Sequence, residues 1–165
     1  MSNKWKNIKK KCYTKEDIIS ISKDWKKQGT VVFSNGCFDI LHPGHIHYLS
    51  KAAELGDKLI IGLNSDQSVS VLKGPTRPYN NENDRQIMLA SLDFVNAVVL
   101  FDQETPIDLI TQIKPDFLVK GGDYAIDQIV GNKIVKENGG KVVSLDFLSG
   151  YSTSLLIDKI QNGQN

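Results

Sequence analysis

The chain contains few cysteines, few arginines and no long apolar run. Its 165 residues include only Cys12 and Cys37 as cysteines, too few for a disulfide framework. This fits a reducing compartment, so we expect a cytoplasmic location. No apolar stretch approaches the roughly 20 residues that cross a bilayer, and the basic start lacks the hydrophobic region of a signal peptide. A formal net charge of +1 argues against a nucleic-acid surface, so we expect neither membrane nor nucleic-acid partners.

Arginine is scarce, although lysine is common. The chain has 18 lysines but only two arginines, Arg77 and Arg85, which lie in one short segment. A guanidinium can grip a phosphate through two parallel hydrogen bonds, which a lysine cannot do. We therefore predict that both arginines grip a phosphate. Chance clustering is the alternative, and for Arg85 a surface ion pair with Glu82 or Asp84 is another.

The N-terminal segment is rich in lysine. We interpret it as a solvated arm rather than as a contact for RNA or membrane, and its lysines are Lys4, Lys6, Lys9, Lys10 and Lys11. A helix is expected from about residue 15 to 27, with Thr14 as its N-cap. No linker or repeat divides the chain. We therefore expect residues 1–29 to belong to the same single domain as residues 30–162.

Apolar runs alternate with helical segments along the rest of the chain. Five segments are predicted to be buried strands, at 30–33, 58–63, 95–101, 117–119 and 141–145. Continuous apolar strands between helices predict a five-stranded parallel sheet with helices on both faces, a doubly wound α/β fold. Ligands of such sheets bind at the carboxyl ends of the strands. A long loop, expected over 64–81, starts at this edge.

The most informative segment, residues 33–45, joins the first of these strands to a helix. The helix is predicted to begin at His42-Pro43-Gly44-His45, because proline suits the first helical turn. Free N–H groups, the helix dipole and two imidazoles would then converge, which predicts an anion site suited to triphosphate. The alternative is a glycine-rich turn with core histidines. A zinc site is disfavoured because His47 would point elsewhere and the cysteines lack ligand spacing, so we predict no protein-bound metal.

The pattern Gly-x-Phe-Asp-x-x-His-x-Gly-His resembles the signature of the cytidylyltransferase-like nucleotidyltransferases, which have a Rossmann-like fold. Over residues 30–160 the chain is similar to the branch that acts on D-glycero-β-D-manno-heptose 1-phosphate, through segments 72–74, 77–78, 118–124 and 152–153. The resemblance implies transfer of AMP from ATP to this sugar phosphate by in-line displacement, giving ADP-heptose for the lipopolysaccharide core and pyrophosphate. It also implies Mg²⁺ bound with ATP and a homodimer. Many relatives carry a fused sugar kinase, whereas we expect a stand-alone unit here.

The resemblance also assigns roles to individual residues. The residues implied to be catalytic are His42, His45, Lys73 and Arg85. Those implied to bind the nucleotide are Asn35, Gly36, Phe38, Gly44, Gly121, Asp123, Ser152, Thr153 and Ser154. Those implied to bind the acceptor are Asp39, Asn64, Arg77 and Lys120. Structural roles remain open alternatives for several of them, including a capping role for Asp39, turn formation for Asn64 and a solvated position for Lys73.

One departure from the family pattern bears on the choice of substrate. Relatives that activate glycerol phosphate with CTP carry an arginine five residues before the first serine of the 152–154 cluster, where this chain has Phe147. This argues against that branch and puts one phosphate contact in doubt. Two alternatives stay open: a cytidylyltransferase for a small alcohol phosphate such as glycerol 3-phosphate, and a non-catalytic nucleotide-binding regulatory module.

Overall fold

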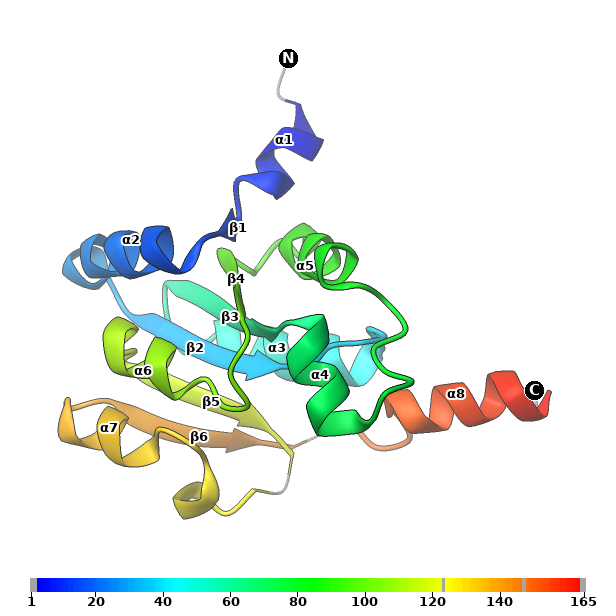
Figure 1. The fold of residues 1–165 in the computed structure, drawn as a ribbon. Helices are drawn as coiled ribbons and strands as arrows, with labels where there is room; N and C mark the ends of the chain where they lie inside the picture. Colours follow the sequence, from blue (N-terminus) through cyan, green and yellow to red (C-terminus); the bar gives the residue numbers. More distant parts are fainter. Residues whose placement is uncertain (1–2, 123, 147, 164–165) are drawn as a thin grey trace.

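The computed structural model describes residues 3–122, 124–146 and 148–163, and its core is a parallel sheet of six strands (Figure 1). The strands are β1 (Cys12–Tyr13), β2 (Val31–Gly36), β3 (Lys58–Asn64), β4 (Ala97–Phe101), β5 (Phe117–Gly121) and β6 (Lys141–Leu145). The helices are α1 (Lys4–Lys9), α2 (Lys15–Gln28), α3 (Pro43–Ala53), α4 (Asp66–Lys73), α5 (Glu82–Ser91), α6 (Ile107–Ile113), α7 (Asn132–Glu137) and α8 (Thr153–Asn162), with a short 3-10 turn η1 (Ile126–Gln128).

The strand order is β1-β4-β3-β2-β5-β6, and every neighbouring pair is parallel. The doubly wound parallel α/β fold is therefore confirmed, but the prediction of five strands is wrong. The additional strand is β1, in which Cys12 pairs with Val98 and Tyr13 with Val99 at the edge of the sheet. Two residues are too few to show any hydrophobic period, so sequence patterning could not find this strand.

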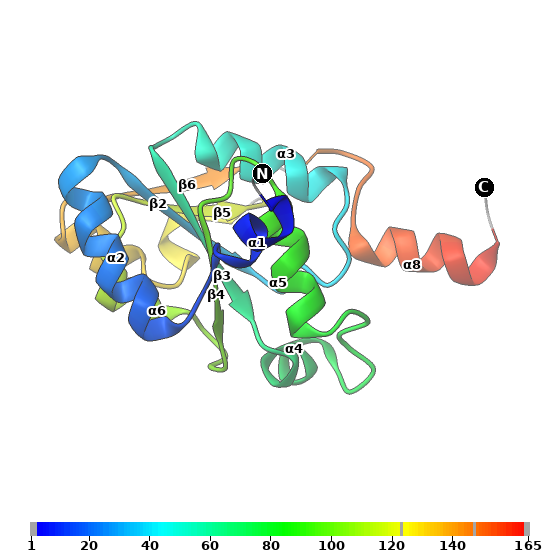
Figure 2. The ribbon, with the colours of Figure 1, turned by 90° about the horizontal axis from the view of Figure 1, so that it is seen from above.

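Alternate residues of the central strands pack into two separate apolar layers. Val31 and Phe33 of β2 face one layer, which helices α2, α6 and α7 cover. Val32, between them, faces the other layer, which α3 and α5 cover. Figures 1 and 2 show these helices on opposite sides of the sheet. Because both faces are buried, the strands are almost uniformly apolar rather than alternating.

Two segments differ from their predicted conformations. Residues 4–9, for which no helix was predicted within the solvated arm, form helix α1, capped by the side chain of Asn3. Within the predicted loop 64–81 lies helix α4, whose N-cap Ser65 accepts a hydrogen bond from the backbone N–H of Ser68 (3.2 Å). Both helices are short, at six and eight residues, and a side chain caps the N-terminus of each.

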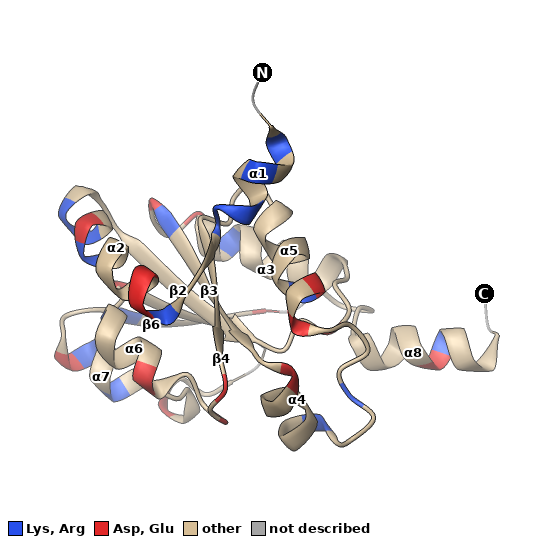
Figure 3. Ribbon diagram, turned by 45° about the horizontal axis from the view of Figure 1, so that its top comes forward, with Lys and Arg blue, Asp and Glu red and all other residues tan. Residues whose placement is uncertain are grey.

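The two terminal helices extend away from the sheet. Helix α8 projects from the body and has no buried residue, and Figure 3 shows little charge along it, in contrast to the lysines of α1. No helix within residues 3–122, 124–146 and 148–163 is both long and apolar enough to cross a membrane.

Candidate functional site

A cleft of about 480 Å³ lies at the carboxyl ends of the central strands. Eleven of the predicted site residues line it: Asn35, Gly36, Phe38, Asp39, His45, Asn64, Lys73, Arg77, Lys120, Thr153 and Ser154. Five others do not line it: His42, Gly44, Arg85, Gly121 and Ser152. Asp123 and Phe147 lie outside the described residues. Side chains that are distant in the sequence thus meet at one edge of the sheet, as parallel strands require.

The two histidines of the β2–α3 turn stack on each other. Their ring centroids are 3.8 Å apart and their planes are inclined by 23°. The Nδ1 atoms of His42 and His45 are buried and have no hydrogen-bond partner among the described residues. Buried polar atoms without partners cost free energy, so a bound water, a ligand or a reacting group is expected to meet these two nitrogens.

Burial keeps this imidazole pair neutral. The pKa of His45 is lowered to about 4, mainly by burial and also by the adjacent His42, while a hydrogen bond with the backbone of Ile40 opposes the shift. Burial also lowers the pKa of His42. An anion placed against the rings would favour their protonated forms. The pair is therefore a neutral site that can become cationic when an anion binds.

Gly44 allows the starts of two helices to lie together. A Cβ atom at this position would lie 3.0 Å from His42 Nδ1 and 3.2 Å from the Cβ of Tyr151, just before α8. Ser152 caps α8 by accepting a hydrogen bond from the N–H of Leu155 (3.1 Å), and Thr153 and Ser154 follow it into the cleft. The first N–H groups of a helix have no intrahelical partner, so α8 presents donors beside the histidine pair.

Phe38 supports His45 from the side. Its ring centroid lies 5.3 Å from that of His45 in an edge-to-face arrangement, and the Phe38 side chain is almost fully buried. Its backbone has a φ of 46°, in the left-handed region that a bulky residue rarely adopts. Such strain is tolerated only when the surroundings enforce it, and it is concentrated at functional sites.

A lysine with no acidic partner among the described residues reaches into the cleft from the end of β5. The Nζ atom of Lys120 donates to the backbone oxygen of Asn35 (3.1 Å) and lies 3.4 Å from its Oδ1. Burial lowers the pKa of Lys120, and the charge of Lys73 lowers it further, while Cys37 has the opposite effect. A partly desolvated ammonium without a carboxylate gains most from an anionic ligand.

Asp39 holds the loop that follows α4. Its carboxylate accepts hydrogen bonds from Arg77 Nε (2.5 Å) and from the backbone N–H groups of Tyr79 (2.7 Å) and Asn80 (3.0 Å). Both oxygens are thus occupied by this loop. The Arg77 guanidinium also lies over the Tyr79 ring at 4.9 Å and lines the cleft. Asp39 therefore orients Arg77, which differs from both the helix cap and the direct acceptor contact considered from sequence.

The structure corrects the prediction for Arg85. Its side chain is 0% exposed and does not line the cleft. It donates to the backbone oxygens of Cys37 (2.6 Å), Asn64 (2.8 Å) and Asn80 (2.9 Å) and to the carboxylate of Asp66 (2.7 Å). These partners come from three segments around the site, at residues 37, 64–66 and 80, and Arg85 holds the three segments together. It is neither a phosphate clamp nor a surface ion pair.

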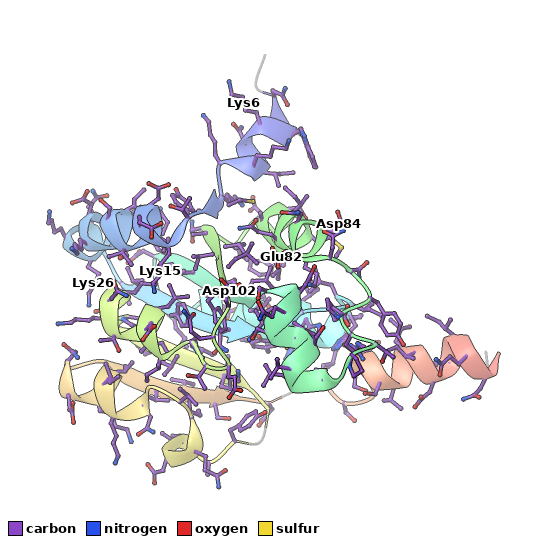
Figure 4. The ribbon with its side chains drawn as sticks, in the orientation of Figure 1. Lys6, Lys15, Lys26, Glu82, Asp84 and Asp102 are labelled. Carbon is purple, nitrogen blue, oxygen red and sulfur yellow. The ribbon has the colours of Figure 1, made fainter. Side chains whose placement is uncertain are left out.

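The start of α5 reinforces the same junction. Glu82 accepts a hydrogen bond from the N–H of Asp66 (2.8 Å), which brings the start of α4 against the start of α5, where Figure 4 shows Glu82 and Asp84. Among the predicted residues near this junction, Asn64 donates through Nδ2 to Ser68 Oγ (2.9 Å) and still lines the cleft. Lys73 ends α4 at the rim of the cleft and is exposed.

Sequence reasoning missed two stretches of the cleft wall. One is Glu104-Thr105-Pro106 after β4, and the other is Gln128-Ile129-Val130, which begins at the last residue of η1. The first was open to prediction, because it follows a strand end just as the other site segments do. The second begins within a 3-10 turn, which has no periodic signal in the sequence.

The cytidylyltransferase-like family model matches residues 33–159, which include both the histidine turn and most of α8. The chain belongs to the cytidylyltransferase-like family. Its curated relatives include the bifunctional protein HldE of Methylobacillus flagellatus, which is 51% identical over 146 residues, covering 88% of this chain and 30% of that protein. The HldE protein of Helicobacter hepaticus is 50% identical over 163 residues, covering 99% of this chain and 33% of that protein.

This cytidylyltransferase-like chain therefore spans about a third of the length of the relatives it matches. Among solved structures it resembles a lipopolysaccharide core biosynthesis protein from Thermoplasma volcanium, with a TM-score of 0.57 and 27% identity, covering 75% of this chain and 99% of that one. A pantoate-beta-alanine ligase from Francisella tularensis has a TM-score of 0.61 at 18% identity, covering 92% and 78%, and shares the fold alone.

Proposed function

We propose that this chain is a nucleotidyltransferase that transfers AMP from ATP to D-glycero-β-D-manno-heptose 1-phosphate, forming ADP-heptose and pyrophosphate for lipopolysaccharide core synthesis. The observation that carries the reaction type is the stacked imidazole pair beside the start of α8, whose buried Nδ1 atoms have no partner among the described residues, next to a cleft whose wall carries Lys73, Arg77 and Lys120. The choice of acceptor rests on the similarity to HldE and to a lipopolysaccharide core biosynthesis protein.

The reaction needs positioning and charge stabilisation rather than a protein nucleophile. A sugar phosphate is already dianionic near neutral pH, because its second pKa is about 6. One of its oxygens attacks the α-phosphorus of ATP, the new P–O bond forms, and the bond to the β-phosphate bridging oxygen breaks with release of pyrophosphate. His42, His45 and the N–H groups of Thr153 and Ser154 would stabilise the charge that develops during this transfer.

The remaining cations would neutralise the two anionic partners. Lys73 and Arg77 lie on the wall formed by α4 and its following loop, and Lys120 lies at the end of β5. We assign Lys73 and Arg77 to the acceptor phosphate. Lys120, for which the resemblance implies an acceptor contact, is assigned instead to the nucleotide phosphates, because its Nζ atom lies against Asn35. Asn35, Gly36 and Phe38 would shape the nucleotide side of the cleft. Asp39 and Arg85 would act through the residues that they hold.

Mg²⁺ is expected to enter as part of the MgATP substrate. No group of three or more His, Cys, Asp or Glu side chains able to hold a metal occurs within the described part of the chain, and both oxygens of Asp39 are engaged. Mg²⁺ usually keeps several waters and binds mainly through substrate phosphates in such enzymes. A cytoplasmic location and a homodimer belong to the same proposal.

The test is a matrix of two nucleotides and two acceptors. We expect pyrophosphate release from ATP with heptose 1-phosphate, and much less from CTP or with glycerol 3-phosphate. His45→Ala should lower kcat by about 10²–10³-fold, the loss typical for removal of a donor to developing charge. His47→Ala, an exposed histidine of the same helix, is the control and should keep wild-type turnover. Turnover only with CTP and glycerol 3-phosphate would identify a cytidylyltransferase, and tight ATP binding without turnover would identify a regulatory module.

A further inference from the structure

We propose that Glu104 selects the acceptor by accepting a hydrogen bond from a hydroxyl group of its sugar. This inference rests on the proposed function, in that it names the part of the cleft that reads the sugar. It concerns a residue after β4 for which neither the family signature nor the histidine turn gives a role.

Glu104 is the carboxylate in the cleft wall that has no hydrogen-bond or ion-pair partner among the described residues. Only Asp39 and Glu104 contribute carboxylates to the wall among the described residues, and Asp39 is occupied by Arg77 and the backbone of its loop. Glu104 makes no hydrogen bond or ion pair with any residue that the structure describes. Glu104 is exposed, so water solvates its oxygens, and a hydroxyl group bound in the cleft can replace that water.

The Glu104 backbone is held at a fixed place relative to Lys73. Ser68 of α4 donates through Oγ to the backbone oxygen of Gln103 (3.0 Å), and Ser68 is itself fixed by Asn64 Nδ2 (2.9 Å). On the other side of Glu104, Pro106 is buried at the start of α6. The loop after β4 and helix α4 thus form one block. This block carries a cation, Lys73, and a free carboxylate, Glu104, into the same cleft.

A carboxylate and an ammonium on one block suit a sugar phosphate. A free carboxylate repels polyphosphate, so it does not serve the nucleotide's phosphates, and it accepts strong hydrogen bonds from hydroxyl groups. The acceptor phosphate would lie on Lys73, and a sugar hydroxyl would reach Glu104. The ATP ribose also has hydroxyls, but the nucleotide phosphates are expected at the β2–α3 turn and the start of α8, on other elements of the site.

The experiment measures binding without ATP, by isothermal titration of the wild-type protein and of Glu104→Ala. The ligands are heptose 1-phosphate and inorganic orthophosphate. In Glu104→Ala, loss of a hydrogen bond to a charged group should lower the affinity for heptose 1-phosphate by about 10-fold or more. Orthophosphate should bind as before or slightly tighter, because a repulsive charge has been removed. Glu137→Gln, an exposed glutamate at the end of α7, is the control and should change neither affinity.

If Glu104 had only a structural role, Glu104→Ala would weaken the binding of both ligands equally, and that result would overturn the inference. It is also overturned if the wild-type protein binds heptose 1-phosphate no more tightly than orthophosphate. Ser68→Ala adds a positioning test, because loosening Gln103 should raise the KM for the acceptor and leave kcat unchanged. Failure of the proposed function looks different: heptose 1-phosphate binds in a Glu104-dependent way, yet ATP yields no pyrophosphate.

Discussion

Two polar clusters follow β2, one around Arg85 and one formed by His42 and His45, and they differ in how far their hydrogen bonds are satisfied. In the cluster around Arg85, the guanidinium has four partners, and the Asp39 carboxylate beside it has three. In the histidine pair, two buried nitrogens have no partner among the described residues. The contrast indicates different roles for the two clusters. The buried charge of Arg85, with hydrogen bonds to four partners, stabilises the fold, whereas the buried nitrogens of the histidine pair can still bind a ligand.

The largest effect on stability is expected from breaking the satisfied cluster. Arg85→Met removes four donors and leaves Asp66 and three backbone oxygens without them, so the free energy of unfolding should fall by about 3–5 kcal/mol. Urea denaturation measures this loss. Arg77→Met should cost clearly less, because Asp39 keeps two backbone N–H donors. Equal losses in the two variants would contradict the distinction drawn between the two arginines.

A smaller effect, a dependence of the free energy of unfolding on pH, is expected from the histidine pair. The pKa of His45 is about 4 in the folded protein and near 6.5 when unfolded, so the unfolded state binds more protons between these values. The part of the free energy of unfolding that depends on neutral His45 is fully present above about pH 6.5, and it decreases as the pH falls toward 4. At pH 5 the loss is about 2 kcal/mol. His45→Gln should lose correspondingly less stability between pH 7 and pH 5, and parallel pH profiles would refute this account.

The smallest change in stability is expected at Gly44. In Gly44→Ala the new methyl group presses on the His42 ring and on Tyr151, while alanine gains up to about 1 kcal/mol in helix propensity over glycine. These two effects should nearly cancel in the melting temperature. Turnover should nevertheless fall by at least 10-fold, because the His42 ring must move. Unchanged turnover would show that the stacked geometry is not needed.

The sequence predicts the layered fold and the edge of the sheet where the site lies. Thr14 does cap α2, and the apolar runs do form parallel strands, because both signals are local. Strand β1 and helix α4 were not predicted, since each is too short to show a period. The position of Arg85 could not be predicted either: its four partners are brought together only by the fold, and a guanidinium suits a phosphate and a set of backbone oxygens equally well.

The central claim is that a polyphosphate binds between the histidine turn and the start of α8. A crystal structure of the protein with Mg²⁺ and α,β-methylene-ATP, which cannot be cleaved at the reacting bond, tests it directly. The account predicts phosphate oxygens within hydrogen-bond distance of both imidazoles and of the backbone N–H groups of Thr153 and Ser154. Phosphates bound elsewhere, with the His42 and His45 rings still stacked and without contact to them, would contradict it.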